Sequence, residues 1–315
     1  RFIGLVGRRV DAQLQEARVG VGVVEQADIG LPVAHLVDQV ALAHAFPRDA
    51  VGAAEEFDAA HEVLAGHGNG DAVVRGGRRP APLVEQLEFD PELARRITPR
   101  ADAILLSHTH FDHVLDTPGI ARQTGARVFG SASAIHLCRS HGIPESQLQC
   151  VEFGAGGSPC EAEVGPFRLR FWPSAHSAFL LGRVPFPGDI ADCTDVPMRA
   201  GAYRCGAVFG AEIEVGGRRL FHVGSAELVE QGWRVANVDL AMACVAGWTT
   251  TERYPERLVA ALSPGAVLLH HWDNFLRPID QEARAFPAMQ MPALVDRLQA
   301  AARDLTVGAL PIFGS

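Results

Sequence analysis

The chain has 315 residues, which is enough for one large domain or two smaller ones. Hydrophobic residues make up 48% of it and charged residues 21%, a balance that is typical of globular proteins. No apolar run approaches the roughly 20 residues that a membrane-spanning helix needs. The net charge of −9 argues against a long nucleic acid as the partner.

The six cysteines are scattered, and none of them forms a close Cys-x-x-Cys pair. A zinc site built from thiolates is therefore not expected. Scattered cysteines in a chain of this size indicate reduced thiols, and we expect a cytoplasmic protein. No pattern in the sequence indicates an oligomeric state.

Residues 1–82 carry the weakest pattern and contain only three aromatic residues. Residues 18–25 and 71–75 are candidate strands, although apolar and polar residues alternate poorly there. Because large aromatic side chains supply much of the buried area of a core, we expect this part to be less well packed than the rest. Four histidines in it match no ligand spacing and are interpreted as surface or structural residues: His35, His44, His61 and His67.

From Leu83 onward the elements are clearer. Asp90 and either Ser131 or Ser133 are placed to cap helices, and Gly125 is placed to end one. The glycine pair at 216–217 indicates a hairpin. The predicted elements share apolar or amphipathic runs bounded by Gly, Pro or polar residues. In chain order they are helix 91–97, strand 103–106, helix 115–124, strand 127–129, a helix that follows Ser131 or Ser133 and runs to Arg139, strands 167–171, 208–215, 219–223 and 239–245, helix 253–262, strand 266–270 and helix 291–303.

The most informative segment is 107–113, which has the pattern His-x-His-x-Asp-His directly after a predicted buried strand. Imidazole and carboxylate groups suit zinc, iron or manganese. Residues two apart in an extended segment point the same way, so His108 and His110 can share one ion. Asp112 and His113 stand where the chain turns toward a helix, and they could reach a second ion beside the first.

The order of these residues resembles the metallo-β-lactamase superfamily, whose members carry this motif, then a lone His, a lone Asp and a final His. The resemblance implies an α/β fold, an αββα sandwich of two mixed β-sheets flanked by helices. It divides the chain into a poorly matched N-terminal segment, 1–82, which could contribute strands to the first sheet, and a metal-binding domain, 83–315. It also implies that His108, His110 and His176 are the ligands of a first metal.

By the same resemblance Asp112, His113 and His271 are the ligands of a second metal. His271 is aligned with the last histidine of the family because related hydrolases often continue with an aromatic residue, two polar residues and Phe. His270 points to the opposite face of the predicted strand, and it is interpreted as a packed histidine or one that supports a ligand.

The chain departs from the family at Ser225, which stands where the bridging Asp is expected. A neutral hydroxyl is a poorer metal ligand than a carboxylate, so either the second metal binds weakly, or Glu227 or water takes the place of the bridge. His222, on the preceding strand, is interpreted as a core histidine.

The resemblance implies a metal-dependent hydrolase that uses a metal-bound hydroxide on an ester, lactone, thioester or phosphodiester, with one or two Zn²⁺ ions, or Fe or Mn. Asp112 would ligate the second metal or act as the base that orients water. The expected substrate is a small or lipid-like molecule and not a nucleic acid. The alternatives are a mononuclear iron redox enzyme of the same fold and a non-catalytic or regulatory member, which Ser225 would suit.

The loop 178–204 is long, rich in proline and glycine, and follows His176 directly, so we expect it to border the active site. Phe179, Phe186 and Met198 either line an apolar pocket there or anchor the loop onto the core.

Overall fold

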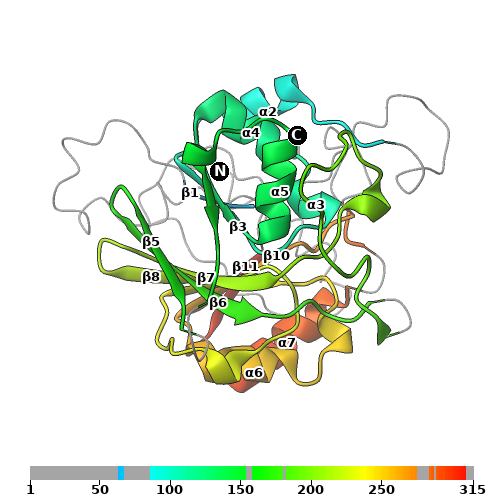
Figure 1. The fold of residues 1–315 in the computed structure, drawn as a ribbon. Helices are drawn as coiled ribbons and strands as arrows, with labels where there is room; N and C mark the ends of the chain where they lie inside the picture. The colour runs from blue at the N-terminus through cyan, green and yellow to red at the C-terminus, as the bar shows by residue number, and fades with distance from the viewer. Residues whose placement is uncertain are drawn as a thin grey trace.

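The structure is a computed structural model that describes residues 63–66, 86–153, 158–179, 182–274, 284–286 and 289–309. Two β-sheets pack face to face, and helices cover the outer face of each sheet (Figure 1). The predicted αββα sandwich is therefore confirmed. Candidate strands 18–25 and 71–75 and the four N-terminal histidines lie outside the described residues.

The first sheet has the strand order β1-β2-β3-β4, and all of its described pairings are parallel. Its strands are β1 (Val63–Gly66), β2 (Ala103–Leu106), β3 (Arg127–Gly130) and β4 (Leu148–Cys150). One strand from the segment 1–82 thus extends this sheet. The helices on this side of the molecule are α2 (Pro91–Ile97), α3 (Phe111–Val114), α4 (Thr117–Thr124) and α5 (Ala132–Ser140).

The second sheet has the order β11-β10-β9-β8-β7-β6-β5 and is mixed, because β8 to β11 pair in parallel and β5 to β8 pair antiparallel. The strands are β5 (Cys160–Val164), β6 (Phe167–Ser174), β7 (Val208–Val215), β8 (Arg218–Val223), β9 (Leu240–Cys244), β10 (Ala266–His270) and β11 (Thr306–Ala309). Two helices cover its outer face, α6 (Tyr254–Leu262) and α7 (Met291–Ala301). Short 3-10 helices lie at Glu145–Gln147, Ala200–Ala202, Glu230–Gly232 and Trp248–Thr250.

The predicted helix boundaries follow from capping groups. The Asp90 carboxylate accepts hydrogen bonds from the first backbone N–H groups of α2, at 3.0 Å each. Of the two candidate serines, Ser131 caps α5 by accepting from Ala134 N at 3.4 Å. Gly125 adopts the left-handed conformation that ends α4, with φ 79°. The helix predicted from residue 115 begins at Thr117, after the separate short helix α3.

Four short strands of the described chain were not predicted: β1, β4, β5 and β11. Each has three to five residues and stands at an end of the described strand order of its sheet. Such strands bury too few apolar residues to leave a clear periodic signal.

The two sheets are joined by an apolar layer that lies between them. Phe129 of the first sheet stacks on Phe171 of the second, with ring centroids 5.8 Å apart and an interplanar angle of 20°. Phe129 is fully buried, and Leu105, Leu169 and Ile213 belong to the same core cluster. This layer fixes the position of the strand ends of one sheet over those of the other.

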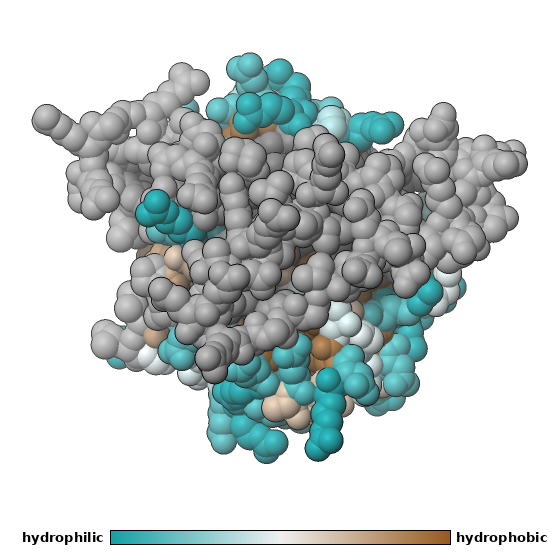
Figure 2. All heavy atoms as spheres, turned by 180° about the vertical axis from the view of Figure 1, so that it is seen from behind, coloured by the Kyte–Doolittle hydropathy of each residue, from teal (hydrophilic) through white to brown (hydrophobic). Residues whose placement is uncertain are grey.

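Where described residues are visible in Figure 2, hydrophilic side chains gather at the top and bottom of the view, with some apolar ones between them. Among the described residues, Phe179 and Val229 are the large hydrophobic side chains that are exposed. In this part of the chain no helix combines the length and apolarity that crossing a bilayer requires.

We predict that Phe129→Ala lowers the free energy of unfolding by about 3–5 kcal/mol, because it opens a cavity between the sheets. Phe179→Ala is the matched control, since Phe179 is 49% exposed and its removal leaves no cavity. Equilibrium urea unfolding measures both variants, and equal effects would contradict the assignment of this layer as the core.

Candidate metal centre

The site lies where the carboxyl ends of four strands meet. β6, β8 and β10 run in the same direction, so their carboxyl ends share one edge of the second sheet. The end of β2 lies close to this edge. Ser107 directly follows β2, and its backbone carbonyl accepts a hydrogen bond from Phe209 N of β7 at 2.8 Å. Gly224 after β8 allows this approach, since a Cβ there would lie 2.0 Å from Ser107 Oγ.

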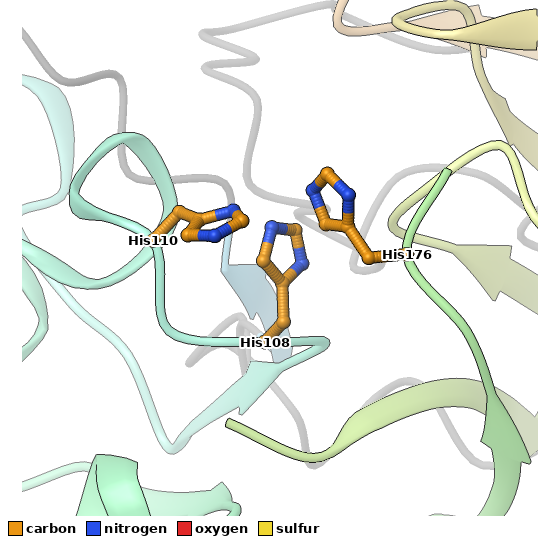
Figure 3. A group of neighbouring side chains, drawn as sticks. All are labelled: His108, His110 and His176. Carbon is orange, nitrogen blue, oxygen red and sulfur yellow. The ribbon is translucent and has the colours of Figure 1, made fainter. Parts of the chain in front are cut away.

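The predicted first ligand group is brought together. The rings of His108 and His110, from the segment after β2, point toward the ring of His176, which follows β6 (Figure 3). One nitrogen from each ring lies within 4.8 Å of the other two. The ring centroid of His176 lies 4.8 Å from that of His108 and 4.6 Å from that of His110.

Hydrogen bonds decide which ring nitrogen is free to bind a metal. His110 Nε2 donates to Pro185 O at 2.8 Å, and His176 Nδ1 donates to Ser177 O at 2.8 Å. Since a carbonyl oxygen only accepts, these nitrogens carry the protons, and His110 Nδ1 and His176 Nε2 keep lone pairs. The partner of His108 Nδ1 is the Ser107 hydroxyl at 3.0 Å.

The remaining nitrogen of His108, Nε2, is buried without a hydrogen-bond partner among the described residues. Burial without a partner costs free energy unless another group satisfies the lone pair. Three lone pairs held at one point by hydrogen bonds on the far side of each ring are the arrangement of a metal site. These residues therefore fit a bound divalent cation.

The predicted second group is also assembled. Asp112 Oδ2 lies 3.3 Å from His271 Nε2 and 3.6 Å from His113 Nε2, and the donor atoms of the three residues lie within 4.8 Å of one another. The ring centroids of His108 and His113 are 3.8 Å apart, so the two groups are neighbours. His271 adopts φ 55°, an uncommon backbone conformation for a residue with a side chain.

Burial sets the charge of the site. It lowers the pKa of His108, His110 and His113, and it lowers the pKa of His176 to about 4, so these imidazoles are neutral near pH 7. Burial alone would raise the pKa of Asp112, but the attraction of His113 and the hydrogen bond from His271 outweigh it and hold this pKa below its ordinary value. Neutral imidazole and ionised carboxylate are the forms that bind metals.

Ser225 contacts the segment that carries His176, the third ligand of the first group. Its Oγ is buried and accepts a hydrogen bond from Ser177 N at 3.1 Å. Its role as a metal ligand stays a prediction. Glu227 does not fill the gap in this structure, because its carboxylate accepts from Arg257 Nη1 and Thr251 Oγ1, both at 3.2 Å.

His222 and His270 form a separate buried pair behind the site. Their rings stack with centroids 4.9 Å apart, and His270 Nε2 donates to Val223 O at 3.1 Å. Burial lowers the pKa of His222 to about 3. Both are packed histidines, as the sequence indicated.

The loop after His176 borders the site, as predicted. Met198 is buried in the core under the first sheet's helices and so anchors the loop. Phe179 is 49% exposed and lies three residues after His176, while the Phe186 ring is 6.3 Å from the His110 ring. The loop therefore combines an anchor, Met198, with one aromatic side chain, Phe186, next to His110.

Two functional features were not predicted from the sequence. The Pro185 carbonyl, which orients His110, belongs to a loop without a motif. Asp273, two residues after His271, is 6% exposed, and its Oδ1 has no hydrogen-bond partner among the described residues. Burial raises the pKa of Asp273 against the attraction of His271, and the nearby Asp112 raises it further.

Comparison with known proteins places residues 71–295 in one family, because they match the family model described as "Beta-lactamase superfamily domain". Among curated proteins, the chain is similar to a UPF0173 metal-dependent hydrolase from Anaeromyxobacter sp. (strain K), with 27% identity over 59% of this chain and 64% of the relative. A relative of the same name from Myxococcus xanthus (strain DK1622) is 40% identical over 23% of this chain and 26% of the relative. The chain thus spans about 64% of the length of the first of these relatives.

Among solved structures, the chain is similar to Igni18, a metallo hydrolase from the hyperthermophilic archaeon Ignicoccus hospitalis KIN4/I. The TM-score is 0.46 and the identity 19%, with 74% of this chain and 84% of that chain covered.

We predict that the metal-free protein loses stability on acidification. The unfolded chain restores the pKa of His222 to about 6.5, so between about pH 6.5 and 3 the unfolded state binds a proton that the folded state does not. The free energy of unfolding therefore rises with pH across this window and falls as the pH is lowered. His222→Leu should flatten the dependence by up to about 1.4 kcal/mol per pH unit. Urea unfolding between pH 4 and 7 measures the slope, and an unchanged slope would refute the prediction.

We predict that the second group binds a cation more weakly than the first, so that one metal per chain dominates at limiting supply. The reason is that a hydroxyl at 225 offers only a dipole where a carboxylate would offset repulsion between two dications. Ser225→Asp should raise metal content toward two per chain, whereas the uncharged Ser225→Asn should not. Elemental analysis after dialysis decides this, and two tightly held metals in the wild type would contradict it.

Proposed function

We propose that this chain, which belongs to the metallo-β-lactamase superfamily, is a metal-dependent hydrolase. The names of its curated relatives support the proposal, since they are described as metal-dependent hydrolases. The assembled ligand groups also support it, because the donor atoms within each group lie within 4.8 Å of one another.

The observation that carries the proposal is the set of three lone pairs in the first group. His108 Nε2, His110 Nδ1 and His176 Nε2 would hold the metal, and Ser107, Pro185 and Ser177 bind the other nitrogen of each ring. We propose zinc, because three neutral imidazoles are a common zinc ligand set, with iron or manganese as the other ions this set accepts.

A divalent ion bound there would lower the pKa of water toward neutrality and stabilise negative charge that develops on a substrate oxygen. The ionised Asp112 would orient the attacking water by accepting a hydrogen bond from it. Its pKa is held low by His113 and His271, so it is suited to holding a proton donor in place rather than to removing the proton itself.

The proposed substrate is an ester, lactone, thioester or phosphodiester of a small or lipid-like molecule. The aromatic ring of Phe186, 6.3 Å from the His110 ring, supports an apolar group on it. The net charge of −9 supports a small molecule over a nucleic acid, whose phosphates this chain would repel. The cytoplasm, where thiols stay reduced, is the location we propose, and the free state of the six cysteines supports it.

Metal analysis combined with a hydrolysis screen over lactones, thioesters, carboxylic esters and phosphodiesters tests the proposal. We predict that the purified protein holds zinc, and that His108→Ala lowers kcat/KM on any accepted substrate by more than about 100-fold. We set this limit because the loss of a residue that merely orients a metal ligand already lowers metal affinity or activity by about 10–100-fold.

His141→Ala is the matched control, because His141 follows α5 outside both ligand groups and its loss should change neither metal content nor rate. An iron-containing protein that consumes oxygen and hydrolyses none of the four substrate classes would overturn the proposal in favour of a redox enzyme.

A further inference from the structure

Thr109 stands between two metal ligands in the sequence, but its side chain is engaged elsewhere. The rings of His108 and His110 on either side of it point toward His176 (Figure 3). Thr109 is fully buried, and its hydrogen bonds go to residues 204 and 205, at the end of the loop that follows His176. The hydroxyl therefore serves this loop and not the metal position.

The end of the loop is fixed to Thr109 through both side chain and backbone. The Thr109 hydroxyl donates to Arg204 O at 2.5 Å and lies 3.1 Å from Cys205 O. The backbone N–H of Thr109 donates to Cys205 O at 2.9 Å. The next residue, Gly206, has φ 65°, and a Cβ there would lie 2.8 Å from Thr109 Oγ1. A glycine at this position thus leaves room for the hydroxyl.

The start of the loop is fixed to its end. Phe186 O accepts a hydrogen bond from Cys205 N at 2.9 Å. Pro185, the residue directly before Phe186, accepts from His110 Nε2 at 2.8 Å. A closed path of hydrogen bonds therefore leads from Thr109 through the two ends of the loop back to the ring of His110, its neighbour in the sequence.

The Pro185 carbonyl at the end of this path decides which nitrogen His110 offers. Because a carbonyl only accepts, Nε2 carries the proton and Nδ1 keeps the lone pair. If the carbonyl moved away, the ring could turn, or its proton could pass to Nδ1. Either change would remove one of the three lone pairs of the first ligand group.

We propose that the Thr109 hydroxyl is a positioning group for metal binding. By holding residues 204–205, it keeps the Pro185 carbonyl in place and so fixes the nitrogen that His110 presents to a cation. Thr109 acts through the loop and is itself no ligand. The inference rests on the metal binding contained in the proposed function, and not on hydrolysis.

Titration of the metal-free protein with Zn²⁺ alone tests the inference. Thr109→Val keeps the shape of the side chain and removes the hydroxyl, so the affinity of the stronger site should fall by at least about 10-fold. Thr109→Ser keeps the hydroxyl and should retain most of the wild-type affinity. Equal affinities of wild type and Thr109→Val, or a Thr109→Ser variant as weak as Thr109→Val, would overturn the inference.

Thr124→Val is the matched control. The Thr124 hydroxyl also donates to a backbone carbonyl, that of Ile120 at 2.7 Å, but it lies at the end of α4 and outside both ligand groups. The affinity for Zn²⁺ should be unchanged in this variant. A loss equal to that of Thr109→Val would show a general effect of removing such a hydroxyl and would also overturn the inference.

NMR of the metal-free protein separates positioning from a merely structural role. Correlation of the ring protons and nitrogens of His110 should show the proton on Nε2 in the wild type and a mixture of both tautomers in Thr109→Val. The wild-type tautomer alone in the variant would overturn the inference. This measurement needs no bound metal, so a wild type that binds no Zn²⁺ would refute the proposed function while the tautomer still decides the inference.

Ser133→Ala loosens the same loop from the other side and serves if Thr109→Val does not fold. Ser133 Oγ of α5 accepts from Ile190 N at 3.0 Å and donates to Asp189 Oδ1 at 3.1 Å. Its loss should also lower the affinity of the stronger site. In the double variant with Thr109→Val the two losses should be less than additive, because both act through one loop. A Ser133→Ala variant with wild-type affinity and the wild-type tautomer of His110 would overturn the route through the loop.

Discussion

The site depends on the convergence of three imidazoles, in which the buried Nε2 of His108 has no hydrogen-bond partner among the described residues. Ser107, Pro185 and Ser177 hold the rings from behind, so the rings cannot turn to find other partners. A bound cation would remove the cost of this arrangement, because each nitrogen lone pair would then coordinate the ion. Ser107, the residue before His108, can approach the chain after β8 this closely because Gly224 has no side chain.

The ligands themselves could be predicted from the sequence because most of them sit in one short motif after a buried strand. His176 and His271 required the order of motifs along the chain, since each is a lone histidine. The orientation of the rings could not be predicted. The partner of His110 is a backbone carbonyl 75 residues away, and a carbonyl is carried by every residue type. Asp273 belongs to no motif, and its burial is a property of the tertiary structure alone.

The loop that carries Pro185 is part of the scaffold as well as the border of the site. Ser133 of α5 donates to Asp189 Oδ1 at 3.1 Å and accepts from Ile190 N at 3.0 Å, so the first sheet's helical layer holds the loop. The same loop orients His110 at 2.8 Å. Substitutions that loosen its contact with α5 would therefore reach the metal ligands through a backbone carbonyl, without touching the site directly.

The two ligand groups carry different charges, because the first consists of three histidines and the second contains the carboxylate of Asp112. Three neutral histidines leave a dication in the first group with its full charge, which favours ionisation of water there. The same charge repels a second cation, because the His108 and His113 rings that separate the groups are only 3.8 Å apart. The carboxylates therefore belong on the second side. Asp112 lies on that side, whereas a bridging carboxylate would have reduced the charge of both ions at once. With a serine at the bridging position, an ion in the first group would keep its full polarising charge.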